Sequence, residues 1–221
     1  MNLLLLFPED FISPTRVRIR GRRLDEVNRI GATTLRAGVI DGRIGTAELV
    51  APGELEVTLD SDPPPALPLT LILALPRPKV LNRVIAGATS MGIKKIFLVN
   101  AWRVEKSYWK SPKLDHLRDQ ALLGLEQARD TVLPQIELQR FFVPFVEGLK
   151  IDGLALVAHP GASVSCPRDV RQPLTLAIGP EGGFIDAEIA SFQRAGFRPV
   201  NLGARILRVE TALPALVGRL F

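Results

Sequence analysis

The alternation of apolar and polar residues indicates a β-rich amino-terminal part. Residues 15–23 (TRVRIRGRR) place arginines on one side and Val17 and Ile19 on the other, which predicts a half-buried strand with an arginine face. Residues 42–50 and 54–60 read as two further strands. The short apolar run at the start lacks a basic flank and meets Pro8, so it predicts a first strand and no signal peptide. Residues 22–30 between these strands predict one or two helical turns.

The rest of the chain alternates apolar strands with helices. Continuous apolar strands are predicted at residues 69–76, 94–100, 154–160, 174–180 and 198–203. Helical spacing is predicted for residues 79–92, 111–130, 186–196 and 210–220. Ser111 and Pro112 suit the start of the second of these helices, and Pro214 is expected in the first turn of the last one. This pattern is typical of an α/β fold with a parallel sheet covered on both faces, which binds ligands at the carboxyl ends of its strands.

A proline-rich stretch separates the two parts. Residues 60–68 (DSDPPPALP) hold three consecutive prolines, which favour an extended, stiff connection. We therefore expect one domain at residues 1–65 and a second at residues 66–221, both of ordinary domain size.

Composition and charge favour an acidic partner and a reducing compartment. The chain of 221 residues has 47% apolar residues, a formal net charge of +5 and one cysteine, Cys166, so no internal disulfide is expected. No run approaches the roughly 18 apolar residues of a membrane span, so we expect a cytoplasmic protein. Between Arg16 and Arg43, eight arginines face three acids. RNA binding is expected from this face, and a solvated edge strand is the alternative. The arginines on which the expectation rests are Arg16, Arg18, Arg20, Arg22 and Arg23.

Three turns at predicted strand ends are the candidate binding loops: residues 159–163 (HPGAS), 179–184 (GPEGGF) and 202–208 (LGARILR). Neither a P-loop nor a dinucleotide-binding glycine motif is present. Glu181 opposes a phosphate in the glycine turn, by about 4 kcal/mol at 4 Å for an effective dielectric near 20. The turn suits a ligand that is neutral or cationic there, such as a sulfonium. The alternative is a tight turn before a helix, with Glu181 in solvent.

Other chemistry-bearing residues allow two interpretations each. Arg208 and Glu210 suit phosphate binding and proton transfer, or else mark a helix start with Thr211 as its cap. Residues 102–110 (WRVEKSYWK) interleave aromatics with cations and suit stacking on an extruded base, or else Trp102 belongs to the core. His159 has no companion at ligand spacing, so we expect no metal site.

The loop motifs resemble one known family. Residues 176–189 (LAIGPEGGFIDAEI), followed by residues 201–212 (NLGARILRVETA) and preceded by HPGAS, are similar to the RsmE family of 16S rRNA uridine methyltransferases. Strong similarity runs from residue 154 to the end, and the amino-terminal part matches only in outline. The resemblance implies a SPOUT-type domain with a deep trefoil knot, a small PUA-like β-barrel at the amino end, and a homodimer. It also implies S-adenosylmethionine as cofactor and N3 of a uridine in the decoding region of the small-subunit rRNA as target.

The resemblance also implies residue roles. Arg208 is expected to stabilise the uridine anion, and Glu210 to act as general base with Glu181 as its rival. The sequence departs from the family pattern at Val209, where the family usually has threonine, and in several motifs outside the cofactor loops, so the cofactor half is better supported than the RNA-binding half. A different RNA target and a non-catalytic RNA-binding protein are therefore retained as alternatives. The residues expected to hold the cofactor are Ala158, His159, Gly179, Pro180, Glu181, Gly182, Gly183, Leu202, Gly203, Arg205, Ile206 and Leu207.

Overall fold

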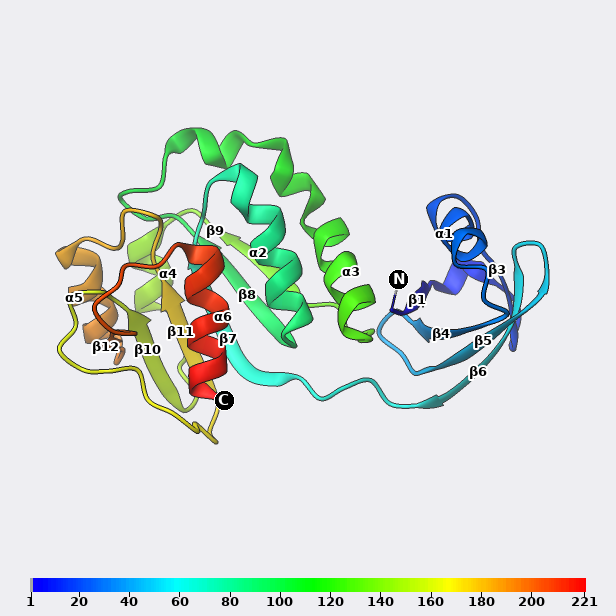
Figure 1. The fold of residues 1–221 in the computed structure, drawn as a ribbon. Coiled ribbons are helices and arrows are strands. Elements are labelled where there is room, and N and C mark those ends of the chain that lie inside the picture. The colour runs from blue at the N-terminus through cyan, green and yellow to red at the C-terminus, as the bar shows by residue number, and fades with distance from the viewer. Residues whose placement is uncertain (1) are drawn as a thin grey trace.

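The amino-terminal part is built on a six-stranded mixed sheet. The computed structural model describes residues 2–221 (Figure 1). The sheet has the order β1-β4-β5-β6-β3-β2, in which β1 and β4 are parallel and the other pairs antiparallel. Its strands are β1 (Leu4–Leu6), β2 (Phe11–Ser13), β3 (Arg16–Arg18), β4 (Thr34–Val39), β5 (Ile44–Ala51) and β6 (Glu54–Ser61). Among the described residues β1 and β2 do not pair with each other, so a closed PUA-like barrel stays a prediction.

The core of this part follows the predicted alternation. Val17 and Ile19 are fully buried, while Arg16 and Arg18 are exposed. A 3₁₀ helix (Pro8–Asp10) joins β1 to β2, and α1 (Arg22–Ile30) is longer than the one or two turns predicted. The buried side chains of this core are Leu4, Leu6, Val17, Ile19, Val27, Ala37, Ala47, Leu55 and Val57.

The second part contains the predicted parallel sheet. Its order is β12-β10-β11-β7-β8-β9, and every neighbouring pair is parallel. The strands are β7 (Leu67–Ala74), β8 (Ile93–Val99), β9 (Gln135–Gln139), β10 (Leu154–Ala158), β11 (Leu174–Ile178) and β12 (Arg198–Val200). The helices are α2 (Pro78–Ser90), α3 (Leu117–Ala128), α4 (Phe142–Glu147), α5 (Asp186–Arg194) and α6 (Val209–Leu220). The α/β class and the parallel sheet predicted from the sequence are thereby confirmed.

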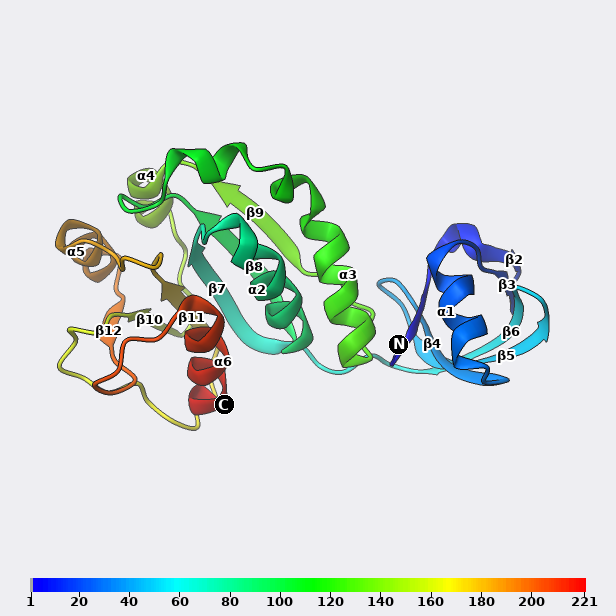
Figure 2. The ribbon, with the colours of Figure 1, turned by 45° about the horizontal axis from the view of Figure 1, so that its top comes forward.

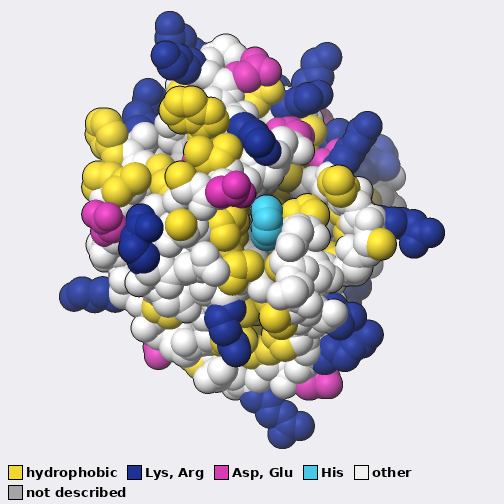
Figure 3. All heavy atoms as spheres, turned by 90° about the vertical axis from the view of Figure 1, so that its left-hand side faces the viewer, with side chains coloured by type: hydrophobic (Ala, Val, Ile, Leu, Met, Phe, Trp, Pro, Cys, Tyr) yellow, Lys and Arg dark blue, Asp and Glu magenta, His cyan; other side chains and the backbone are white. Residues whose placement is uncertain are grey.

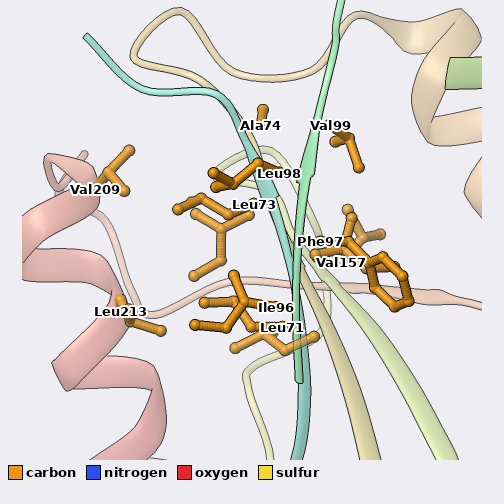
Figure 4. Packing of buried hydrophobic residues seen from close by; sticks show 14 of the residues in the cluster. Leu71, Leu73, Ala74, Ile96, Phe97, Leu98, Val99, Val157, Val209 and Leu213 are labelled. Atoms are coloured by element: carbon orange, nitrogen blue, oxygen red, sulfur yellow. The ribbon is translucent and has the colours of Figure 1, made fainter. Parts of the chain in front are cut away.

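Helices cover both faces of the parallel sheet (Figures 1 and 2). On one face, Val209 and Leu213 of α6 point toward Ile96 and Leu98 of β8 (Figure 4). Phe97 points to the opposite face, where its ring lies 5.0 Å from that of Phe145 in α4. Because successive strand residues point to opposite faces, strands covered on both sides are apolar over most of their length.

Several element boundaries differ from the sequence expectation. The proline-rich connection is only residues 62–66, because β7 already includes Pro68. Residues 111–130 begin with a 3₁₀ helix (Pro112–His116) before α3, and the Ser111 hydroxyl accepts a bond from Lys113 N at 3.3 Å. The expectation for Pro214 is wrong: it lies inside α6, beyond the first turn. Its exposed position lets the helix tolerate the missing N–H bond on the solvent side.

The two parts contact each other through α3. Leu3 and Leu5 pack against Leu125. Arg22 Nη2 of α1 lies 2.7 Å from Glu126 Oε1 of α3. The hydrogen bond from Arg22 to Glu126 is the main reason that the pKa of Arg22 is raised. After α3, Leu133 N donates to Asp41 Oδ1 at 2.8 Å and Thr131 Oγ1 donates to Gly42 O at 2.5 Å. Apolar packing, an ion pair and hydrogen bonds between side chains and backbone therefore join the two parts.

Candidate functional site

The three candidate loops meet at one edge of the parallel sheet. They follow β10, β11 and β12, and these strands are neighbours with β10 in the middle. His159 N donates to Val200 O at 2.9 Å, and Asn201 N donates to Val164 O at 2.9 Å. The parallel register thus brings together loops that are far apart in the sequence.

Asn201, which the sequence analysis did not single out, connects the first loop to the third. Its side-chain Nδ2 donates to Ala162 O at 2.6 Å, and its Oδ1 accepts from Gly203 N at 2.9 Å. An asparagine suits this position because one side chain can donate and accept at once. Asn201 therefore holds the backbone of both loops in place.

The glycine turn after β11 needs glycine at two positions. Gly183 N donates to Pro180 O at 2.7 Å, and Gly183 has a φ of +74°, which other residues rarely adopt. A Cβ at Gly179 would lie 2.9 Å from Phe184 N, so a side chain there would push the turn open. The backbone segments of the turn therefore pack closely against each other, and their N–H and C=O groups are available to bind a ligand.

Glu181 is held by Arg77, which the sequence analysis did not foresee. Its Oε1 accepts a hydrogen bond from Arg77 N at 3.2 Å and lies 3.6 Å from Arg77 Nε. Arg77 caps α2, so the carboxylate lies at the positive end of that helix. The repulsion expected between Glu181 and a phosphate is therefore partly offset by Arg77, and the carboxylate anchors the glycine turn to α2.

The three loops surround one cavity of about 320 Å³. This volume lies within the range of about 300–1,000 Å³ that is typical of small-molecule sites. All twelve residues expected to hold the cofactor line it. On the face in Figure 3, hydrophobic side chains gather around a hollow beside a histidine and an acidic side chain. Ten further residues line the cavity, and three of them, Pro160, Gly161 and Phe184, belong to the candidate binding loops. The lining residues that the sequence analysis missed are Arg103, Ile178, Val200, Asn201, Val209, Ala212 and Leu216.

Arg208 and Glu210 lie beside the cavity rather than in its lining. Arg208 is the amino-terminal cap of α6, and Glu210 lies in the first turn, where a negative charge is favourable. Thr211 follows Glu210 inside the helix, so the alternative that Thr211 caps the helix is wrong. Neither charged side chain makes a hydrogen bond or ion pair with another described residue. Both are thus free to meet a substrate at the cavity mouth.

Arg103 joins the segment after β8 to the cavity. Its Nη1 donates to Gly182 O, and its side chain lines the cavity. Next to it Trp102 is 80% exposed, whereas Trp109 is buried. The alternative that Trp102 belongs to the core is therefore wrong. Burial and a hydrogen bond to Glu105 raise the pKa of Tyr108 in the same segment.

Ion pairs neutralise most of the amino-terminal arginine face. Arg16 pairs with Glu56 at 3.2 Å, and Arg18 pairs with Glu54 at 2.6 Å. Arg22 pairs with Glu126, as described above. Arg23 pairs with buried Asp10. Of the five arginines predicted to bind RNA, Arg20 alone forms no ion pair with a described residue. The net charge available to phosphate from this face is smaller than the sequence implied.

Two features of the described chain concern metals and membranes. Residues 2–221 contain no group of three or more histidine, cysteine, aspartate or glutamate side chains arranged to hold a metal ion. Over the same residues, no helix combines the length and the apolar character that crossing a bilayer requires.

Comparison with known proteins decides the family. A family model described as an RNA methyltransferase domain matches residues 63–220. The chain belongs to this family. The match covers the parallel sheet, its helices and all three loops, and it confirms the family resemblance predicted from the loop motifs.

Curated relatives and a solved structure agree with this assignment. Ribosomal RNA small subunit methyltransferase E of Treponema pallidum is 29% identical, over 96% of this chain and 87% of that protein. The protein of the same name from Synechocystis is 32% identical, over 82% of this chain and 60% of that protein. The Neisseria gonorrhoeae enzyme of the same name, solved bound to S-adenosyl methionine, has a TM-score of 0.74 and 21% identity. That alignment covers 97% of this chain and 95% of that one. The overall fold, including the amino-terminal part, is therefore shared.

Proposed function

We propose that this family member is an S-adenosylmethionine-dependent methyltransferase that modifies N3 of a uridine in the decoding region of small-subunit rRNA. One observation carries the proposal: all twelve residues of the cofactor-loop motifs line a single cavity at the carboxyl edge of the parallel sheet. The names of the curated relatives support small-subunit rRNA as the substrate. A cytoplasmic location and the trefoil knot stay predictions.

The cavity fits the cofactor in shape and chemistry. The Gly179–Gly183 turn lines the cavity with backbone groups that can bond an adenosine, and a Cβ at Gly179 would displace them because it meets Phe184 N at 2.9 Å. Apolar walls from Ile178, Leu202 and Leu207 suit an adenine ring. Nucleoside recognition by backbone groups between apolar walls is the usual design of such sites. When bound, S-adenosylmethionine supplies an electrophilic methyl group.

The residues at the cavity mouth are suited to proton transfer. The imide proton of uridine must leave N3 as the new N–C bond forms, and uridine is too weak an acid to lose it unaided at neutral pH. In our proposal the Glu210 carboxylate accepts that proton and the Arg208 guanidinium stabilises the negative charge on the base. Glu181 is the weaker candidate for the base, because Arg77 already engages its carboxylate.

Methyl transfer from labelled cofactor to small ribosomal subunits tests the chemistry. The subunits come from cells that lack the protein, and mass mapping locates the modified uridine. Glu210→Gln and Arg208→Ala are expected to lower turnover on the order of a hundredfold or more, with cofactor affinity by calorimetry little changed. Near-normal turnover in both variants contradicts the residue roles.

The same measurements separate the alternative functions. A modified base elsewhere in the RNA indicates another target for the same chemistry. If the wild-type protein does not bind S-adenosylmethionine, a non-catalytic RNA-binding protein is indicated.

A homodimer is part of this proposal. Ile206 in the third loop is 80% exposed and lines the cavity, and a second subunit would cover it. Sedimentation of the wild-type protein and of Ile206→Asp tests this, and a wild-type monomer contradicts it.

A further inference from the structure

Exposed aromatic and basic side chains gather at the carboxyl ends of β8 and β9. We call this set the β8–β9 patch: Trp102, Lys106, Lys110, Arg140, Phe141 and Val143. Trp102 is 80% exposed and Phe141 is 76% exposed. The patch members other than Phe141 line a shallow hollow of about 880 Å³. Large aromatics this exposed are unusual in a protein and mark an interaction surface.

The floor of the β8–β9 patch is well fixed. Asn100 N donates to Gln139 O at 2.8 Å, which joins the two segments that carry the patch. Trp109 Nε1 donates to Asn100 Oδ1 at 2.8 Å. The Arg140 guanidinium lies 5.1 Å from the centre of the Trp109 ring and donates to Trp109 O at 3.4 Å. A ligand would therefore meet a cation already held in position.

The positive charge of the patch is free, in contrast to the amino-terminal arginine face. Within residues 2–221, Lys106, Lys110 and Arg140 form no ion pair. Glu188 is the one carboxylate among the residues that line the hollow, and it is buried. Its oxygens accept bonds from Trp102 N at 2.7 Å and Ile185 N at 2.9 Å. The surface thus offers cations to a polyanion beside aromatic rings.

The patch adjoins the cofactor cavity. Trp102 lines the hollow of the patch, and the next residue, Arg103, lines the cavity and donates to Gly182 O in the glycine turn. A strand of RNA that presents a base at the cavity mouth can therefore continue onto the patch.

We propose that the β8–β9 patch binds unpaired nucleotides that flank the modified base, with a base stacked on Trp102 and phosphates held by Lys106, Lys110 and Arg140. This inference rests on the proposed function for the identity of the RNA. Stacking on aromatics combined with phosphate contacts is how proteins hold single strands, whereas ion-paired arginines on a strand add little. A second copy of this chain is the competing occupant, but the three free cations oppose self-contact.

Binding of a fluorescein-labelled single-stranded RNA oligonucleotide, followed by anisotropy, tests the patch. Trp102→Leu is expected to weaken binding on the order of tenfold, while Trp102→Phe keeps a stacking ring and stays near wild type. Leu123→Ala, at an exposed apolar side chain of α3, is the matched control and leaves affinity unchanged. Lys110→Gln is expected to reduce the slope of log affinity against log salt by about 0.7. Thermal melting confirms that each variant folds.

Tryptophan emission gives an independent signal, because Trp102 and Trp109 are the two tryptophans of the chain. RNA is expected to quench wild-type emission, and Trp102→Phe is expected to abolish most of the quenching. Unchanged affinity in Trp102→Leu overturns the proposal. A change in sedimentation without a change in RNA affinity does so too, and assigns the patch to self-association.

The patch and the proposed function fail in different ways. If wild type methylates rRNA and Trp102→Leu has an unchanged KM and RNA affinity, the patch proposal fails and the function stands. If wild type transfers no methyl group but RNA binding depends on Trp102, the function fails and the patch stands.

Discussion

Arg23 is predicted to stabilise the amino-terminal part rather than to bind RNA. Its guanidinium donates to both carboxylate oxygens of Asp10 and to Leu5 O, and it lies 5.0 Å from the centre of the Phe7 ring. The Asp10 side chain is 6% exposed and that of Arg23 is 18% exposed. The perturbation is Arg23→Gln, with Arg20→Gln as the matched control at an exposed arginine without a partner among the described residues.

The expected decrease in the free energy of unfolding follows from the contacts that Asp10 keeps in Arg23→Gln. The Asp10 carboxylate keeps one donor, Phe7 N at 2.8 Å, and loses its cation while staying buried. Removing one partner of a buried ion pair costs about 3–5 kcal/mol. A typical domain has a free energy of unfolding of about 5–15 kcal/mol, so the loss is a large share. Arg20→Gln should change it by less than about 0.5 kcal/mol.

Hydrogen exchange of the amides in Leu4–Leu6 is the suitable assay. Fluorescence cannot report on this part, because Trp102, Trp109 and Tyr108 all lie in the second part. In the double variant with Asp10→Asn, the free energy of unfolding is expected to fall by less than the sum of the two single-variant decreases, since no buried charge is then left without a partner. A loss below about 1 kcal/mol in Arg23→Gln, or a drop in RNA affinity larger than that of Arg20→Gln, refutes the reasoning.

Three further predictions test the glycine turn, the burial of Cys166 and the helix packing. Gly179→Ala is expected to weaken cofactor binding at least tenfold by calorimetry, because its Cβ would meet backbone at 2.9 Å; Gly87→Ala, whose Cβ meets nothing within 4 Å, should bind normally. Burial raises the pKa of the Cys166 thiol, so a thiol reagent at pH 8 should label it far more slowly in the native than in the denatured protein; equal rates contradict this. Gly124→Ala, 2.5 Å from Ala86 O, should lower stability by about 1–3 kcal/mol in thermal melts.

The parallel sheet was predictable because its inner strands are largely apolar, with Lys94 and Lys95 at the start of β8 as the main exceptions. Strand β9 was not predicted, since it lies at the sheet edge and three of its five residues are exposed. Helix α4 was missed because it has six residues and contains Pro144. Pro214 was misplaced because its tolerance depends on which side of α6 faces solvent, and local sequence does not carry that information.

The candidate site was predictable where it depends on local backbone and less so where it depends on distant partners. The glycine turn and the third loop are contiguous stretches, and their residues do line one cavity. The partner of Glu181 is Arg77, which lies 104 residues away, and the partner of Arg23 is Asp10, which lies 13 residues away beyond β2 and β3. Charge counts along the sequence therefore overstated both the negative charge at Glu181 and the positive charge of the arginine face.

The contacts between the two parts have a consequence for substrate choice. Arg22 with Glu126, Asp41 with Leu133, and the packing of Leu3 and Leu5 on Leu125 hold the amino-terminal part at a set distance from the cavity. If the amino-terminal part also contacts RNA, as its sequence predicts, the protein holds its two RNA contacts a fixed distance apart. It would accept an RNA whose target base and distal contact lie at that one separation, and geometry would then select the uridine where base identity alone does not.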